Sequence, residues 1–182
     1  MLFVSGCIAR RGMLTDKIYY SNSSPNLQIE VNPSFKYEKG GRNEFDHKFT
    51  DLKNGRWFFL DYYIGSANDT QVDYYNHPSQ WIYEGIPEDS IINKGDTELL
   101  GKKWYFANTL SRKSNGIAFS KYLRRFTDRH NVFTIKYVKW YPKKECGMWN
   151  YSLALDVEKS MFLAKFDESL KKAVTITPYI EK

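Results

Sequence analysis

Six basic side chains lie close together in the second half of the chain: Lys121, Arg124, Arg125, Arg129, Lys136 and Lys139. Residues 101–150 contain 12 basic and 2 acidic residues, whereas residues 1–100 contain 10 basic and 14 acidic ones, so the positive excess lies in one segment. Clustered cations attract phosphates, anionic lipids or acidic glycans. We therefore expect a basic face that binds an anionic partner. The alternative is a solvated sheet face that only keeps the protein soluble.

Four aromatic residues form a second candidate site: Tyr74, Tyr75, Trp81 and Tyr83. They lie within residues 66–90, the least regular part of the sequence, which also contains His77-Pro78, Gly85 and Pro87. Binding residues are often found on loops, and exposed rings there could stack on a ligand. The alternative is that the rings are buried and hold a long loop in place.

The cysteine nearest the N-terminus, Cys7, directly follows Val4-Ser5-Gly6. This tetrapeptide resembles the lipobox of bacterial lipoproteins, in which the cysteine receives a diacylglycerol. The resemblance implies that Cys7 carries a lipid anchor and that residues 1–6 are the end of a signal peptide. Because Ile8 rather than aspartate follows the cysteine, it also implies attachment to the outer membrane, facing the periplasm.

The sequence departs from the lipoprotein pattern in the length of its leader. Only six residues precede Cys7, whereas a signal peptide has about 15–30. If Met1 is the native start, we expect a cytoplasmic protein in which residues 2–8 form an apolar strand. The second cysteine, Cys146, leaves open whether Cys7 is lipidated or pairs in a disulfide.

We predict no catalytic residue, metal site or cofactor. The sequence has no nucleophile elbow, phosphate-binding loop, dinucleotide-binding motif or zinc-protease motif. Its two cysteines and three histidines do not form a ligand cluster. We expect His47 to be a half-buried histidine bonded to a tyrosine hydroxyl, with a ligand or base as the alternative. An enzyme, such as a cell-wall hydrolase, remains an alternative.

The elements that carry these residues are mostly strands. Leu27, Ile29 and Val31 alternate with polar residues, and 14 tyrosines favour half-buried pleated surfaces. A single helical stripe follows near the C-terminus, formed by Phe162, Leu163, Phe166, Leu170, Ala173 and Val174. We predict an α+β, β-rich fold: an antiparallel curved sheet or barrel of seven to nine strands, with one C-terminal amphipathic helix, about 156–174, packed on it.

Turn residues predict three hairpins. Asn54-Gly55 favours a type I′ turn, because both central positions need positive φ. That turn would place these pairs opposite each other: Leu52 and Trp57, Thr50 and Phe59, and Lys48 and Asp61. It would also put His47 opposite Tyr62. A second hairpin is expected at residues 100–103, and a third joins residues 117–126 to 132–141.

We divide the chain into a lipid anchor and tether, residues 1–16, and one β-rich domain, residues 17–182. The function that follows is an envelope lipoprotein, held in the membrane through Cys7, whose non-catalytic domain binds an envelope protein, an anionic lipid or a glycan through its basic sheet region. Nucleic acid is not an expected partner of a periplasmic protein. The alternative is a carrier that holds a small apolar ligand in a cavity between sheet and helix.

Overall fold

The computed structural model describes residues 11–39, 46–64, 82–127, 131–145 and 156–180. The strands are β1 (Arg11–Thr15), β2 (Ile18–Ser21), β3 (Leu27–Val31), β4 (Lys36–Lys39), β5 (His47–Asp51), β6 (Arg56–Ile64), β7 (Ile91–Leu99), β8 (Lys102–Lys113), β9 (Gly116–Phe126), β10 (Asn131–Pro142) and β11 (Val174–Thr177). The helices are α2 (Asp156–Ala173) and the short 3-10 turns η1 (Leu52–Asn54), η2 (Glu88–Ser90) and η3 (Lys143–Glu145).

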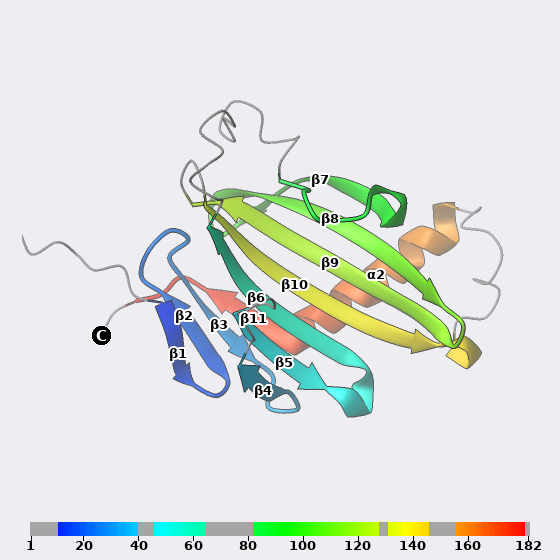
Figure 1. The fold of residues 1–182 in the computed structure, drawn as a ribbon, viewed down its shortest axis with the longest axis horizontal. Coiled ribbons are helices and arrows are strands. Elements are labelled where there is room, and N and C mark those ends of the chain that lie inside the picture. Colours follow the sequence, from blue (N-terminus) through cyan, green and yellow to red (C-terminus); the bar gives the residue numbers. More distant parts are fainter. Residues whose placement is uncertain (1–10, 40–45, 65–81, 128–130, 146–155, 181–182) are drawn as a thin grey trace, which may run out of the picture.

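The strands of the described residues form two antiparallel sheets. The larger has seven strands in the order β4-β5-β6-β10-β9-β8-β7, and the smaller has four in the order β1-β2-β3-β11. In Figure 1 the small sheet lies at one side of the large sheet, and α2 passes behind β9 and β10. The predicted α+β, β-rich antiparallel fold with a helix near the C-terminus is confirmed. The described strands belong to two sheets rather than one, and neither sheet closes into a barrel.

The helix packs on the large sheet through aromatic rings. Phe166 is fully buried, with its ring centroid 5.9 Å from that of Phe119 on β9 and 5.3 Å from that of Tyr137 on β10. The Tyr137 hydroxyl also lies 2.7 Å from the Ser169 hydroxyl. The predicted stripe is therefore correct where its side chains are described, and burial of these rings stabilises helix docking.

The small sheet packs on the same face of the large sheet. Tyr19 of β2 stacks on Phe133 of β10, with ring centroids 5.9 Å apart, and its ring lies 5.2 Å from that of His47 on β5. Tyr19 and Phe133 belong to one continuous apolar core that also includes Phe166 of the helix. The two sheets and the helix thus share a single core.

Two of the three predicted hairpins form with only small changes in their ends. Residues 100–101 turn β7 into β8, and both have positive φ, 55° at Leu100 and 67° at Gly101, as a type I′ turn requires. In the third hairpin β9 pairs with β10, with Val132 opposite Phe126. Local turn chemistry was sufficient to predict these pairings.

The Asn54-Gly55 hairpin has a different register from the one predicted. Thr50 lies opposite Trp57 and Lys48 opposite Phe59, because η1 lengthens the connection and shifts every pair by two residues. A shift of two leaves each side chain on its expected face, since the side-chain period of a strand is two. His47 therefore still points to the core, but it is opposite Leu60 rather than Tyr62, and Tyr37 bonds to it.

Both ends of the described chain differ from the prediction. The tether expected up to residue 16 is wrong for Arg11–Thr15, which form β1 and pair with β2. The helix ends at Ala173, one residue early, and Val174–Thr177 continue directly as β11. Val174 pairs with Val31 and Ile176 with Ile29, so β11 completes the small sheet.

Candidate functional site

The predicted basic residues do not share one face of the sheet. Tyr137 faces the helix, and Lys121 is directly opposite it, so Lys121 faces the helix too. Arg125 pairs with buried Phe133, and Lys139 with buried Phe119, which puts both on the same side. Arg124 pairs with Thr134 and Lys136 with Tyr122, on the opposite side, because neighbouring side chains alternate between faces. Arg129 lies outside the described residues.

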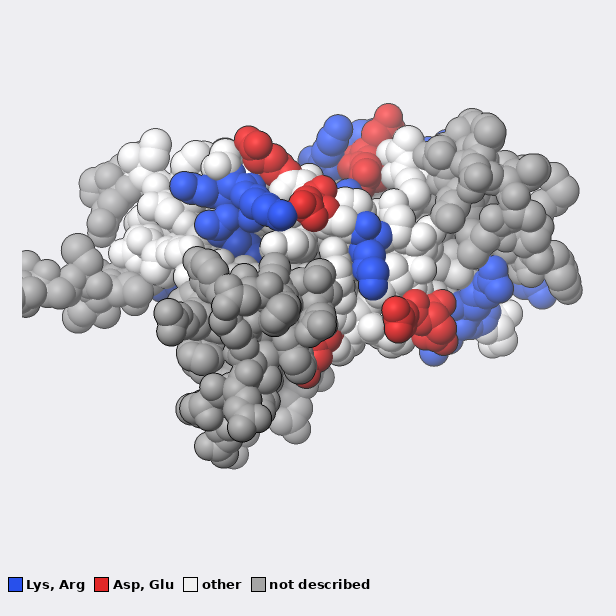
Figure 2. Space-filling view, turned by 90° about the horizontal axis from the view of Figure 1, so that it is seen from above, with Lys and Arg blue, Asp and Glu red and all other residues white. Residues whose placement is uncertain are grey.

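Most of these cations already have partners within the protein. Lys121 Nζ lies 2.7 Å from Asp167 Oδ1 on α2, and Lys139 Nζ donates to the Asn54 carbonyl at 3.2 Å. Lys136 Nζ lies 4.8 Å from the centroid of the Tyr122 ring. In Figure 2 basic and acidic side chains lie side by side on the face shown. The positive excess of residues 101–150 does not translate into one basic face.

Arg124 is a structural cation on the outer face of the sheet. Its Nη1 donates to the carbonyl of Ile82 at 2.8 Å and to that of Glu84 at 2.7 Å. Burial lowers the pKa of its guanidinium. Two carbonyl acceptors bind this buried guanidinium and attach the segment after residue 81 to β9, while its Nε has no hydrogen-bond partner among the described residues. Arg124 therefore holds this segment against the sheet.

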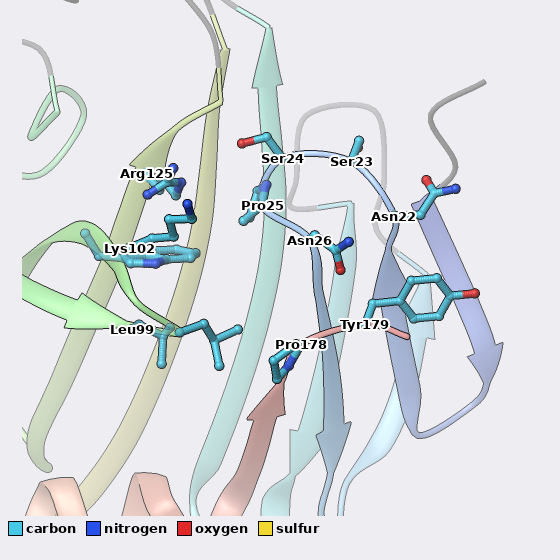
Figure 3. A pocket seen from close by; sticks show the side chains of 12 residues that line it. Asn22, Ser23, Ser24, Pro25, Asn26, Leu99, Lys102, Arg125, Pro178 and Tyr179 are labelled. Carbon is cyan, nitrogen blue, oxygen red and sulfur yellow. The ribbon is translucent and has the colours of Figure 1, made fainter. Parts of the chain in front are cut away.

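Arg125 has a different environment, because it lines a pocket of about 460 Å³ between the two sheets. The β2–β3 loop forms one wall, the β7–β8 hairpin and Arg125 form the other, and the chain after β11 closes the lower side (Figure 3). The lining residues are Asn22, Ser23, Ser24, Pro25, Asn26, Leu99, Leu100, Lys102, Trp104, Arg125, Pro178 and Tyr179. The pocket combines two cations, several small polar groups and an apolar surface.

The pocket is electrostatically positive. Lys102 and Arg125 lie together on one wall and face the loop that carries Ser24 and Pro25 (Figure 3), and the described part of the lining contains no acidic residue. Arg125 donates from Nη1 to the Lys103 carbonyl at 2.9 Å, which fixes the side chain, while its buried Nε has no hydrogen-bond partner in the structure. Among the described residues, neither cation forms an ion pair. An anion in the pocket would therefore meet uncompensated positive charge.

An arginine outside the pocket supports its loop wall. Arg11 donates from Nε to the hydroxyls of Ser21 at 3.2 Å and Ser23 at 3.0 Å, and from Nη2 to the Ser24 carbonyl. Its guanidinium carbon lies 3.7 Å from the centroid of the Tyr62 ring. These contacts connect the first strand to the loop and to the large sheet. The hydrogen bonds from Arg11 therefore stabilise the loop that forms this wall of the pocket.

No protein-family model matches this chain, and no curated protein matches it. We therefore infer the chemistry of the pocket from its own side chains. The described residues contain no group of three or more His, Cys, Asp or Glu side chains able to hold a metal ion. Over the same residues, no helix is both long and apolar enough to cross a membrane.

The remaining predicted residues lie elsewhere. Tyr83 is outside the pocket, where its hydroxyl donates to the Gly95 carbonyl at 3.2 Å and its ring lies 5.0 Å from Lys94 Nζ. This hydrogen bond attaches the turn after residue 81 to the edge strand β7. Tyr74, Tyr75 and Trp81 fall outside the described residues, as do Cys7 and Cys146.

The pocket differs in position from the cavity expected between sheet and helix. In the described part of that interface, the rings of Phe119, Tyr137 and Phe166 are in contact and at most 1% exposed. Of the predicted binding residues that the structure describes, only Arg125 lines the pocket. Sequence reasoning missed the rest, because the β2–β3 loop and the β7–β8 turn are far apart in the chain. Only the pairing of whole sheets brings them together.

Proposed function

We propose that this protein is a non-catalytic binding protein of the bacterial envelope, and that its ligand is a small amphipathic anion held in the pocket between the two sheets. One observation carries the proposal: Arg125 and Lys102 line the pocket, and none of the described residues that line it is acidic. An arginine whose side chain is already fixed loses little entropy when it binds a carboxylate, sulfonate or phosphate. The ligand's charged group would therefore lie on this wall.

The rest of the pocket favours an apolar portion on the same ligand. Trp104 is 1% exposed, and Leu99, Leu100 and Pro178 add aliphatic surface beside it. Ligand pockets typically combine such surface with a few polar groups that fix orientation. The Ser23 and Ser24 side chains provide small hydroxyls on the opposite wall. An inorganic anion alone would leave the apolar surface in contact with water.

The envelope location in this proposal depends on Val4-Ser5-Gly6-Cys7. A lipid on Cys7 would hold the domain at a membrane surface. Expression of the gene with its upstream DNA in a bacterium, followed by palmitate labelling of the native chain and of Cys7→Ala, tests this part. Label that disappears in the variant supports the anchor, and an unlabelled native chain that begins at Met1 contradicts it.

Anilinonaphthalene sulfonate, a fluorescent amphipathic anion, is a suitable probe of the pocket. We expect saturable binding to the folded protein, weakened about tenfold by Lys102→Gln or Arg125→Gln, because each variant removes a charge-assisted contact. Lys165→Gln is a matched control, since it removes an exposed cation from α2. Thermal unfolding of each variant shows whether it is folded. Equal affinity in folded pocket variants and control would overturn the proposal.

A further inference from the structure

We infer that the pocket binds the head group of an anionic membrane lipid, presented by the same membrane that holds the chain through Cys7. This inference rests on the proposed function, since it names the ligand class of that pocket and uses its anchor. Three features carry it: the short distance from the anchor to the pocket wall, the apolar groups beside the pocket, and the positive charge within it.

The first feature is the length of chain between anchor and fold. Arg11, the first residue of β1, is four positions after Cys7, so their α-carbons are at most about 14 Å apart. Arg11 donates hydrogen bonds to Ser23 and Ser24, which line the pocket. A lipid on Cys7 would therefore hold this wall of the pocket within reach of the head groups.

The second feature is the chain that follows β11. Tyr179 lines the pocket, and its ring centroid lies 5.2 Å from that of Tyr20 on β2. Ile180 comes next and is 78% exposed, one of the few large apolar side chains left in water. Tyrosine is enriched at membrane interfaces, where its ring meets the apolar region and its hydroxyl stays in water. Tyr179 and Ile180 thus form an apolar edge beside the pocket, next to the strand that pairs with β1.

The third feature is charge. Lys102 and Arg125 face the pocket without a carboxylate partner among the described residues. Basic residues near an anionic membrane surface are attracted to its head groups. A lipid phosphate on Arg125 would place the start of the acyl chains against Leu99 and Leu100. One ligand would then satisfy both the cations and the apolar wall.

The alternative source of the same chemistry is a soluble phosphate ester that diffuses into the pocket. The position of the pocket beside the anchor favours the lipid, because a tethered domain meets head groups at far higher local concentration than a dilute solute. A binding measurement distinguishes the two sources, because a soluble ester binds the protein without a bilayer.

The test uses the full chain with Cys7→Ser, so that no anchor contributes, and flotation with phosphatidylcholine vesicles that contain or lack phosphatidylglycerol. We expect flotation only with phosphatidylglycerol, about tenfold weaker for Lys102→Gln or Arg125→Gln and unchanged for Lys165→Gln. Equal flotation of pocket variants and control would overturn the inference. Glycerol 3-phosphate, titrated alone, is the second arm. If it binds the pocket while vesicles do not, the lipid inference fails and the proposed function stands.

If neither vesicles, glycerol 3-phosphate nor anilinonaphthalene sulfonate binds the folded chain, the proposed function fails as well. Orientation provides a separate readout. With Cys7 and Cys146 replaced by serine, an environment-sensitive dye at Ile180→Cys should shift to shorter wavelength on vesicle binding. The same dye at Lys53→Cys, on the exposed β5–β6 turn, should not shift (Figure 1). Equal shifts at both positions would contradict the orientation.

Discussion

Arg56 donates from Nε to Oδ2 of Asp51 at 3.0 Å, across the turn that joins β5 to β6. The Asp51 side chain is 3% exposed, and it also accepts hydrogen bonds from Ser34 and Asn54. This carboxylate therefore organises the turn. The turn that forms contains η1 and differs from the simple two-residue turn that the Asn-Gly pair predicts.

The Asp51 cluster makes stability depend on pH in the acid range. Burial alone raises the pKa of the Asp51 carboxyl, but hydrogen bonds from Asn54, Arg56 and Ser34 outweigh it and hold the pKa at about 2. Since the folded pKa lies below the unfolded value of about 3.9, the contribution is present above pH 4 and is lost as pH falls through 2. We expect Asp51→Asn to lower the free energy of unfolding at pH 7 by about 3 kcal/mol. Urea unfolding between pH 7 and 2 measures the loss of stability in the variant and the pH dependence of stability. If the variant loses as much stability as the native protein between pH 4 and 2, the role of Asp51 is contradicted.

His47 produces a second pH dependence, nearer neutrality. Burial lowers its pKa, Asp46 opposes this and Lys39 adds to it, while its Nδ1 lies 3.0 Å from the Tyr37 hydroxyl. Because the unfolded chain binds the proton more tightly, stability falls as pH drops below about 6.5. We expect His47→Gln to reduce the loss of stability between pH 7.5 and 5. Urea unfolding at these two values tests it, and an equal loss in native protein and variant would refute this role.

Lys121 and Asp167 connect β9 to α2, but we expect their ion pair to contribute little. Asp167 is 42% exposed, so water screens the pair. A double-mutant cycle with Lys121→Met and Asp167→Asn should give a coupling energy below about 1 kcal/mol. Phe166→Ala, which removes a fully buried ring, should cost about 3–5 kcal/mol. A larger coupling energy than the Phe166 effect would mean that charge rather than ring packing holds the helix.

Gly116 begins β9 at a point where no side chain fits. A β-carbon there would lie 2.3 Å from the Tyr141 carbonyl oxygen and 2.6 Å from Cζ2 of Trp140. Gly116→Ala should therefore force the hairpin apart and destabilise the protein by about 1–3 kcal/mol. Gly12→Ala is the matched control, since its nearest neighbour would be 3.9 Å away. Equal thermal stability of the two variants would show that the pairing of Gly116 with the end of β10 adapts without strain.

The sequence predicts local features of this fold well and long-range ones poorly. The hairpins of β7–β8 and β9–β10 follow from turn residues that lie next to the strands they join. The strand β11 was missed because its first residue, Val174, continues the helical stripe and only three residues follow it in the strand. Its partner β3 lies near the other end of the chain. No local pattern indicates such a pairing, since it depends on the packing of the whole core.

The predicted binding site differs from the pocket for two reasons: the alternation of side chains along a strand, which the sequence shows, and long-range packing, which it does not show. Six cations were grouped by their closeness in sequence, although odd and even positions of one strand point to opposite faces. This alternation separates Arg124 from Lys121 and Arg125 on β9, and Lys136 from Lys139 on β10. The pocket could not be predicted in this way. Its walls come from the β2–β3 loop, the β7–β8 turn and the chain after β11.

The pairing of β11 with β3 also sets an order of events during synthesis. The ribosome makes β3 early, yet the edge of β3 that receives β11 stays open until β11 has emerged. Contacts so distant in sequence form late, because a long loop must close first. An unpaired strand edge readily joins other chains. A nascent chain of this protein therefore has its greatest need of a chaperone in the interval before β11 has been made.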